Sequence, residues 1–153
     1  MGNIFNNDFR DFIKALNKNA VDYMLVGGYA VILHGYRRTT GDMDIWVRND
    51  KANYEKLIRA FLEFGLPVLD MTLENFLNTK KMDVFSYGRA PVSIEIMTLL
   101  KGCDFDESYK LSQIYIDEGL EIRTIHLNTL KQSKKAAGRY KDLDDLEKLS
   151  DKN

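Results

Sequence analysis

The sequence predicts an α+β protein, in which a mixed β-sheet is flanked by helices and a helical segment follows at the C-terminal end. Segments with the two-residue alternation of strands and segments with helical periodicity follow one another along the chain. Glu118-Gly119 lies between two short apolar runs and indicates a hairpin. Because hairpins join antiparallel strands, we expect a mixed sheet and not a doubly wound parallel one.

The expected elements are separated by residues that favour turns and helix ends. The expected strands are Tyr23–Val26, Asp42–Arg48, Lys81–Tyr87, Val92–Thr98, Ile114–Asp117 and Leu120–Thr124. The expected helices are Phe5–Lys18, Tyr29–His34, Lys51–Phe64, Leu73–Asn78, Phe105–Lys110, Leu127–Ala137 and Asp142–Leu149. Asn49-Asp50 can cap the helix that begins at Lys51, and Gly35 and Gly65 can end the helices that precede them.

Size and composition bound the class of protein. The 153 residues fit a single domain spanning 1–153, with a core at about 20–126 and C-terminal helices at about 127–150. A net charge of -1 argues against tight binding of duplex DNA. Cys103 is the only cysteine, so a disulfide framework is excluded. The sequence contains neither a signal peptide nor an apolar run of membrane-spanning length, and we expect a cytoplasmic protein without a membrane partner.

Asp42 and Asp44 are the first candidates for chemistry. Residues two apart in a strand point to the same face, so the two carboxylates project together while Met43 points into the core. Adjacent carboxylates repel each other unless a cation or a proton is shared between them. Mg²⁺ prefers carboxylates together with phosphate oxygens of a substrate. The alternative interpretation is a solvated strand start, and it would be the better one if the pair stood alone.

Residues around this pair point to phosphate. Gly27 and Gly28 allow the backbone to approach a phosphate closely, although glycines also serve a tight strand-to-helix turn. Arg38 can contact phosphate, and Thr40 can donate a hydroxyl or cap the turn. Arg37 is better explained as a surface cation.

Glu95 is expected to be a third carboxylate of the site. It alternates with Ile94 and Ile96, so it faces the side opposite to those core residues. If its strand pairs with the strand of Asp42 and Asp44, three carboxylates meet. The alternative is an ion pair between Glu95 and a nearby Lys or Arg, because a carboxylate in an apolar strand needs a partner.

Several segments together carry a resemblance to a known family. They are Gly27-Gly28, then Arg38-x-Thr40-x-Asp42-x-Asp44, then Glu95 alone in a later strand, and finally Lys134-Lys-Ala-Ala-Gly-Arg139-Tyr-Lys141-Asp142-Leu-Asp-Asp145-Leu. This pattern resembles the nucleotidyltransferase superfamily of the DNA polymerase beta type. In finer detail it is similar to the small bacterial and archaeal nucleotidyltransferases related to the abortive-infection (AbiE) toxin enzymes. The resemblance extends from about residue 23 to residue 149.

The resemblance implies a nucleotidyltransferase-like fold and a role for each position. Asp42, Asp44 and Glu95 would be catalytic and would bind two Mg²⁺ ions, with Mn²⁺ as the alternative ion. Glu95 stands where Asp is more usual, and Gly28 stands where Ser is frequent. The residues implied in nucleotide binding are Gly27, Gly28, Arg38, Thr40, Lys134, Arg139 and Asp142. For the residues of the tail, the alternative is a solvated helix face.

The predicted reaction is transfer of a nucleoside monophosphate from a nucleoside triphosphate to a hydroxyl acceptor, with release of pyrophosphate. The acceptor is either a small molecule or the end of a tRNA. The near-neutral charge leans slightly away from RNA, but a local patch of cations keeps RNA open: Lys131, Lys134, Lys135, Arg139 and Lys141. Two other classes stay open. One is a non-catalytic module that binds a cognate protein of a toxin–antitoxin pair, and the other is a magnesium phosphatase.

Overall fold

The strands form because short apolar runs are bounded by turn residues, and the sheet they build is mixed. The computed structural model describes residues 5–36, 38–89 and 92–151. Within these residues the strands form one sheet in the order β3-β4-β2-β1-β6-β5. The strands are β1 (Tyr23–Val26), β2 (Asp42–Val47), β3 (Val84–Arg89), β4 (Val92–Met97), β5 (Gln113–Asp117) and β6 (Leu120–Thr124). β2 pairs with β4, and β1 with β6, in parallel, whereas the other neighbours are antiparallel.

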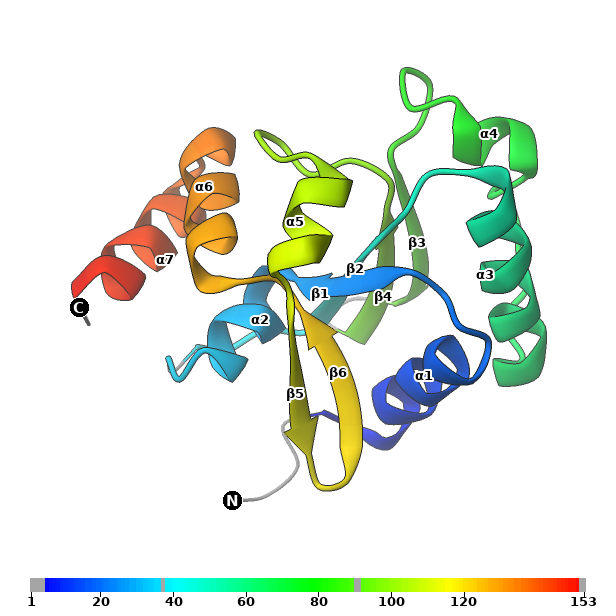
Figure 1. The fold of residues 1–153 in the computed structure, drawn as a ribbon, viewed down its shortest axis with the longest axis horizontal. Coiled ribbons are helices and arrows are strands. Elements are labelled where there is room, and N and C mark those ends of the chain that lie inside the picture. The colour runs from blue at the N-terminus through cyan, green and yellow to red at the C-terminus, as the bar shows by residue number, and fades with distance from the viewer. Residues whose placement is uncertain (1–4, 37, 90–91, 152–153) are drawn as a thin grey trace.

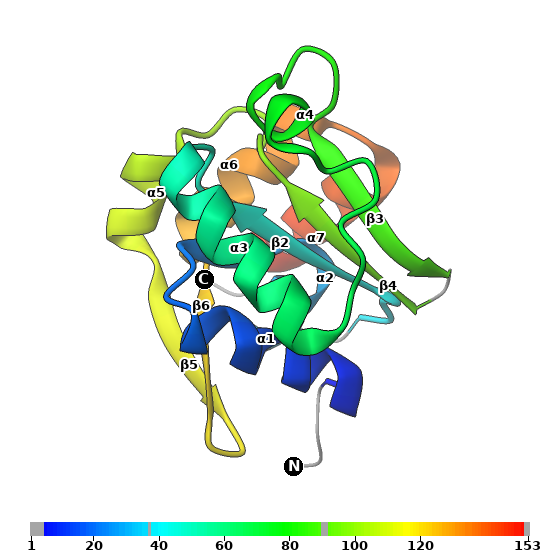
Figure 2. The same ribbon diagram turned by 90° about the vertical axis from the view of Figure 1, so that its right-hand side faces the viewer.

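Helices cover both faces of the sheet. They are α1 (Asn7–Lys18), α2 (Gly27–Leu33), α3 (Lys51–Phe64), α4 (Leu73–Leu77), α5 (Phe105–Leu111), α6 (Leu127–Ala137) and α7 (Tyr140–Asp151). Figure 1 shows α1 and α3 on the opposite side of the molecule from α6 and α7. In Figure 2, α1 and α3 lie in front of the sheet and α6 lies behind it. The prediction of an α+β fold with a mixed sheet is therefore confirmed.

Two apolar clusters result from the alternation along the strands. In β2, Met43 and Ile45 contribute to the larger cluster, which also contains Phe12 of α1 and Phe61 of α3. Trp46 points to the other face, into a smaller cluster with Leu130 of α6. Asp42 and Asp44 lie on the face of Trp46, because all three have even numbers in the same strand. The sheet face below α6 and α7 thus carries the carboxylates.

The boundaries of two elements differ from those predicted. Helix α2 begins at Gly27 and not at Tyr29, so the glycine pair forms its first turn instead of a turn before it. Strand β3 begins at Val84, three residues later than the predicted Lys81. The other predicted helices and strands agree with the structure within two residues at each end.

Candidate active site

The pairing of β2 with β4 brings the predicted carboxylates to one place. In this parallel pair, Asp44 lies opposite Glu95, and Asp42 lies opposite Ser93. Glu95 therefore faces the same side of the sheet as the aspartate pair, as the alternation predicted. The hydroxyl of Ser93 donates to Oδ1 of Asp42 over 2.6 Å and lies 3.3 Å from Oε1 of Glu95. Ser86 of β3 donates to the other oxygen of Glu95. Among the residues that the structure describes, the hydrogen-bond partners of Glu95 are thus serine hydroxyls and not Lys or Arg.

Asp44 carries the clearest electrostatic signature of the site. Burial raises its pKa from the ordinary value of 3.8 to about 6, and the nearby charges of Glu95 and Asp42 add to the increase. Lys134 and Lys141 act in the opposite direction. Repulsion among the carboxylates and attraction to lysines of the C-terminal helices therefore meet at this one side chain.

A small cavity joins the aspartates to the C-terminal helices. It encloses about 100 Å³, and we call it the central cavity. Every predicted site residue except Glu95 lines it: Gly27, Gly28, Arg38, Thr40, Asp42, Asp44, Lys134, Arg139 and Asp142. Arg37 lies outside the described residues. The structure therefore gathers segments that lie far apart in the sequence around one hollow.

Both glycines are required by close neighbours. Gly27 has a φ of +69°, which L side chains rarely adopt, and a Cβ there would lie 2.1 Å from Oδ2 of Asp44. A Cβ on Gly28 would lie 2.2 Å from Nη1 of Arg38 and 2.8 Å from Cβ of Thr40. A serine at position 28, as in the resembled family, would therefore require Arg38 and Thr40 to move. Arg38 and Thr40 are thus held directly above the first turn of α2.

The cations of the cavity are tied together by two buried carboxylates. Nζ of Lys134 lies 3.4 Å from Oδ1 of Asp142 and 3.0 Å from Oδ2 of Asp145. Nε of Arg38 lies 3.2 Å from Oδ1 of Asp145, and Nε of Arg139 lies 2.6 Å from Oδ2 of Asp142. Lys134, Asp142 and Asp145 are at most 6% exposed. The tail is therefore part of an internal ion network, and its interpretation as a solvated helix face is wrong for these three residues.

Burial and charge compete at Asp142. Desolvation by itself raises the pKa of this carboxyl, but the hydrogen bond from Arg139 and the charges of Lys134 and Arg139 lower it by more, so the net shift is downward. Asp142 is thus held as a carboxylate between two cations. It fixes the position of Lys134 and Arg139 on the wall of the cavity.

Three residues that hold the site are not among the predicted site residues. Asp145 was noted only as part of the tail, although it follows Asp142 by one helical turn and must share its face. Ser93 precedes Glu95 by two residues, so the strand period places it on the same face, but the period does not show that its hydroxyl bonds Asp42. Ser86 comes from β3, and only the observed register of β3 and β4 places it opposite Glu95.

The carboxylates fit a magnesium ion that is completed by a nucleotide. Among the described residues, no group of three or more His, Cys, Asp or Glu side chains is arranged to hold a metal ion by itself. Mg²⁺ is commonly bound by one or two carboxylates together with substrate phosphates and water. Asp42 and Asp44 offer such a pair, and the upward shift in the pKa of Asp44 shows a carboxylate that a cation would stabilise.

The fold is that of known nucleotidyltransferases, as the sequence motifs predicted. No family model and no curated protein matches the chain. TM1012 of Thermotoga maritima, proposed to be a nucleotidyltransferase, superposes with a TM-score of 0.59 at 15% identity, over 95% of this chain and 91% of that one. The lincosamide antibiotic adenylyltransferase LnuA, solved with lincomycin bound, superposes with a TM-score of 0.56 at 12% identity, over 97% of this chain and 98% of that one. An antigenic nucleotidyltransferase-like protein from Paracoccidioides brasiliensis superposes with a TM-score of 0.53 at 14% identity, over 92% of this chain and 72% of that one.

The chain has a nucleotidyltransferase fold. Each of these solved structures is matched over more than two thirds of its own length. At identities of 12 to 15% the likeness establishes the fold alone. The finer relation to the AbiE enzymes stays a prediction.

Replacing Asp44 by Asn is expected to stabilise the protein when metal and nucleotide are absent. The folded-state pKa of about 6 exceeds the ordinary 3.8, so the stability that this group contributes at low pH is lost as the pH rises through about 6. Near pH 8, Asp44→Asn should raise the free energy of unfolding by roughly 1 to 3 kcal/mol. Near pH 4 the difference should nearly vanish. Urea unfolding of both proteins across this range measures it.

Asp11→Asn is the control for that experiment, because Asp11 lies in α1 with its side chain 62% exposed. Its effect on stability should be small at both pH values. If the free energy of unfolding had the same pH dependence in the wild type and in Asp44→Asn, the raised pKa could not belong to Asp44.

Asp145→Asn is expected to destabilise the protein far more than Asp144→Asn. Asp145 is 1% exposed and pairs with Arg38 and Lys134, so its removal leaves cations without their counter-charge. A loss of about 3 kcal/mol is expected. In the described part of the chain, Asp144 pairs with Lys148 alone, on the helix surface, and its side chain is 59% exposed. A change within about 0.5 kcal/mol is expected there. Equal losses in urea unfolding would show that the network does not hold α7 in place.

Proposed function

We propose that this protein is a magnesium-dependent nucleotidyltransferase that transfers a nucleoside monophosphate from a nucleoside triphosphate to a hydroxyl acceptor. One observation carries the proposal. Asp42 and Asp44 line the same cavity as the cations Arg38, Lys134 and Arg139 and as the glycine pair. Carboxylates suit divalent ions, and cations beside glycine backbone suit phosphates. The fold likeness to nucleotidyltransferases supports the same reaction class.

Each residue then has a defined task. Asp42, Asp44 and Glu95 would hold two magnesium ions, or manganese in their place. Bound magnesium supplies neutralisation of the charge on the transferred and departing phosphates. The backbone of Gly27 and Gly28 would contact the triphosphate, Arg38, Lys134 and Arg139 would contact its oxygens, and Thr40 would donate its hydroxyl. Asp142 orients Lys134 and Arg139, with which it pairs.

The reaction is a substitution at phosphorus. The oxygen of the acceptor hydroxyl attacks the α-phosphorus, so that a new P–O bond forms. The bond between the α-phosphorus and the oxygen bridging to the β-phosphorus breaks, and its electron pair leaves with pyrophosphate. The hydroxyl proton passes to a carboxylate, for which Glu95 is placed opposite Asp44. The protein contributes mainly position and electrostatic complementarity.

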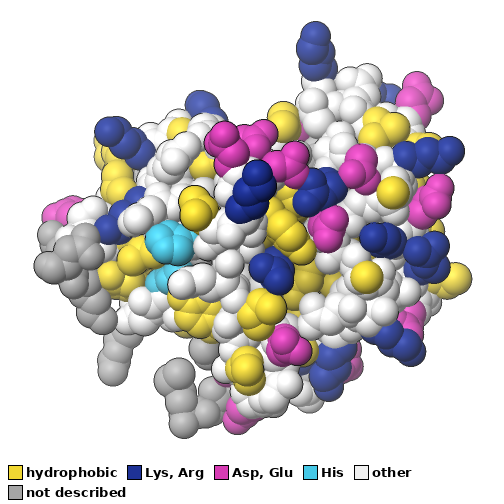
Figure 3. All heavy atoms as spheres, in the orientation of Figure 1, with side chains coloured by type: hydrophobic (Ala, Val, Ile, Leu, Met, Phe, Trp, Pro, Cys, Tyr) yellow, Lys and Arg dark blue, Asp and Glu magenta, His cyan; other side chains and the backbone are white. Residues whose placement is uncertain are grey.

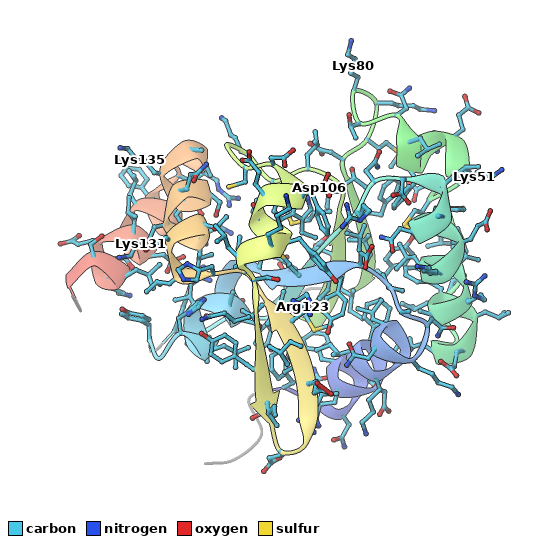
Figure 4. All side chains as sticks on the ribbon, in the orientation of Figure 1. Lys51, Lys80, Asp106, Arg123, Lys131 and Lys135 are labelled. Carbon is cyan, nitrogen blue, oxygen red and sulfur yellow. The ribbon has the colours of Figure 1, made fainter. Side chains whose placement is uncertain are left out.

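The acceptor is a small molecule or the end of a tRNA. LnuA is an antibiotic adenylyltransferase and matches this chain over nearly its whole length, which favours a small acceptor. The cations that kept RNA open do not form one surface. Lys134 is buried in the ion network, whereas Lys131 and Lys135 lie on the outer side of α6, as Figure 4 shows. Acidic and basic side chains are interspersed on the face seen in Figure 3, which also disfavours duplex DNA.

We place the reaction in the cytoplasm, where nucleoside triphosphates and magnesium are available. No helix in the described part of the chain combines the length and the apolar character needed to cross a bilayer. The alternative function is a non-catalytic nucleotidyltransferase-fold partner of a toxin–antitoxin pair. It rests on the motif resemblance to the AbiE enzymes.

The reaction class is tested by thermal shift with each of four nucleoside triphosphates, with magnesium or with a chelator. At least one triphosphate with magnesium should raise the melting temperature of the wild type by several degrees. Asp44→Asn, compared with its own nucleotide-free state, should lose most of this rise, whereas Asp144→Asn should keep it. Pyrophosphate should be released when a cell extract supplies the acceptor. No shift with any triphosphate would favour the non-catalytic partner, and release of inorganic phosphate would indicate a phosphatase.

A further inference from the structure

A second, larger cavity adjoins the central cavity and has a different chemical character. It encloses about 550 Å³ and lies between the start of β3, the end of β4, the loop before α5, and α6. Aliphatic and sulfur-containing side chains dominate its lining, and we call it the aliphatic cavity: Val84, Met97, Leu99, Leu100, Cys103 and Ala137. Small-molecule sites commonly enclose about 300 to 1,000 Å³ and are mostly apolar with a few polar groups. Asp83, Lys101, Ser133 and Arg139 supply those polar groups here.

The two cavities adjoin each other. Met97, Leu100, Ser133, Ala137 and Arg139 line both. A molecule in the aliphatic cavity would therefore lie against the same walls as the phosphates in the central cavity. The central cavity, at about 100 Å³, has room for phosphate but not for a second reactant.

Met97, which lines the aliphatic cavity, is also the next residue after Glu95 on the same face of β4. Met97 follows Glu95 by two residues in β4, so both side chains are on the same face of the sheet, about 7 Å apart along the strand. A reactant that enters along Met97 thus approaches the residue that is placed to accept its proton.

Close packing between the loop before α5 and helix α6 fixes one wall of the aliphatic cavity. Gly102 has a φ of +78°, and a Cβ there would lie 2.6 Å from Cβ of Ala136, so the loop packs directly against α6. Gln132 of α6 donates to the carbonyl of Gly102, and the thiol of Cys103 lies 3.8 Å from the carbonyl of Thr129. Apolar side chains nevertheless remain open to solvent at the rim, where Leu99 is 49% and Val84 is 40% exposed.

We propose that the aliphatic cavity is the acceptor site and that the acceptor is a small hydroxyl-bearing molecule with an aliphatic body. This inference rests on the proposed function. An aliphatic lining matches an aliphatic body by apolar burial. A nucleobase or a single-stranded RNA end would be expected to stack on an aromatic side chain, and none of the described residues that line this cavity is aromatic. The lining includes an acid, Asp83, as well as the bases Lys101 and Arg139, so it is not the single-sign surface that a phosphate backbone favours.

Cys103 gives a direct readout, because it is the only cysteine of the chain and lines the cavity. Burial raises the pKa of its thiol, so alkylation by N-ethylmaleimide is best followed at mildly alkaline pH. The probes are hexyl and methyl β-D-glucopyranoside, which share their hydroxyls and differ in the alkyl chain. The full chain is incubated with each probe below its micelle-forming concentration, and intact mass reports the alkylated fraction over time.

Hexyl glucoside should slow the alkylation in a saturable way, with a half-protecting concentration at least about tenfold below that of methyl glucoside. Leu99→Gln should raise the half-protecting concentration of hexyl glucoside by roughly three- to tenfold. Leu62→Gln is the matched control, because Leu62 is 81% exposed on α3 and lines neither cavity. This control should behave as the wild type, each variant being normalised to its rate without probe.

Equal protection by both glucosides, or equal effects of Leu99→Gln and Leu62→Gln, would overturn the proposal. So would protection by a short RNA with a free 3′ hydroxyl in the absence of protection by hexyl glucoside. Thermal stabilisation by a triphosphate with magnesium is measured on the same samples. If that stabilisation is present while the glucoside fails, the acceptor site is wrong and the transferase function stands. If the glucoside protects while no triphosphate stabilises, it is the transferase function that fails.

Discussion

The burial of Asp44 among other carboxylates is the constraint on which the site depends. The strand pairing fixes Asp44 opposite Glu95, and burial together with their repulsion raises the pKa of Asp44 to about 6. Cations of the C-terminal helices offset part of this cost, since Lys134 and Lys141 act on Asp44 in the opposite direction. Packing α6 and α7 on the sheet is therefore not separable from forming the site. The same side chains hold the helices in place and balance the charge of the carboxylates.

A second constraint is the room above the first turn of α2. Val26 lies opposite Asp44 in the antiparallel pair of β1 and β2, so the next residue must pass close to that carboxylate. Only a glycine at position 27 allows this approach with a φ of +69°. Arg38 then covers Gly28 and is held there by Asp145. The ion network of the tail thus reaches back to the first turn of the phosphate side.

Local periodicity in the sequence predicted which face of the sheet each carboxylate occupies, but it could not predict how distant elements dock. Alternation alone placed Asp42 with Asp44, and Glu95 opposite Ile94 and Ile96, and the sheet confirms both. The predicted start of α2 is two residues too late, because glycines normally disfavour helix. Here the close approach of Asp44 requires Gly27, and that of Arg38 and Thr40 requires Gly28. Asp145 was missed because its partners Arg38 and Lys134 come from two other segments. No local sequence pattern predicts how α7 packs against the segments of Arg38 and Lys134.

The two adjoining cavities divide the proposed reaction between a polar, charged half and an aliphatic half. The most direct measurement is a crystal structure with magnesium and a non-hydrolysable analogue of the preferred triphosphate. We expect a metal ion bound by Asp42 and Asp44, with the triphosphate along the backbone of Gly27 and Gly28 and its oxygens paired with Lys134 or Arg139. A triphosphate bound elsewhere, or one bound here without a metal ion on the aspartates, would show that this is not the active site.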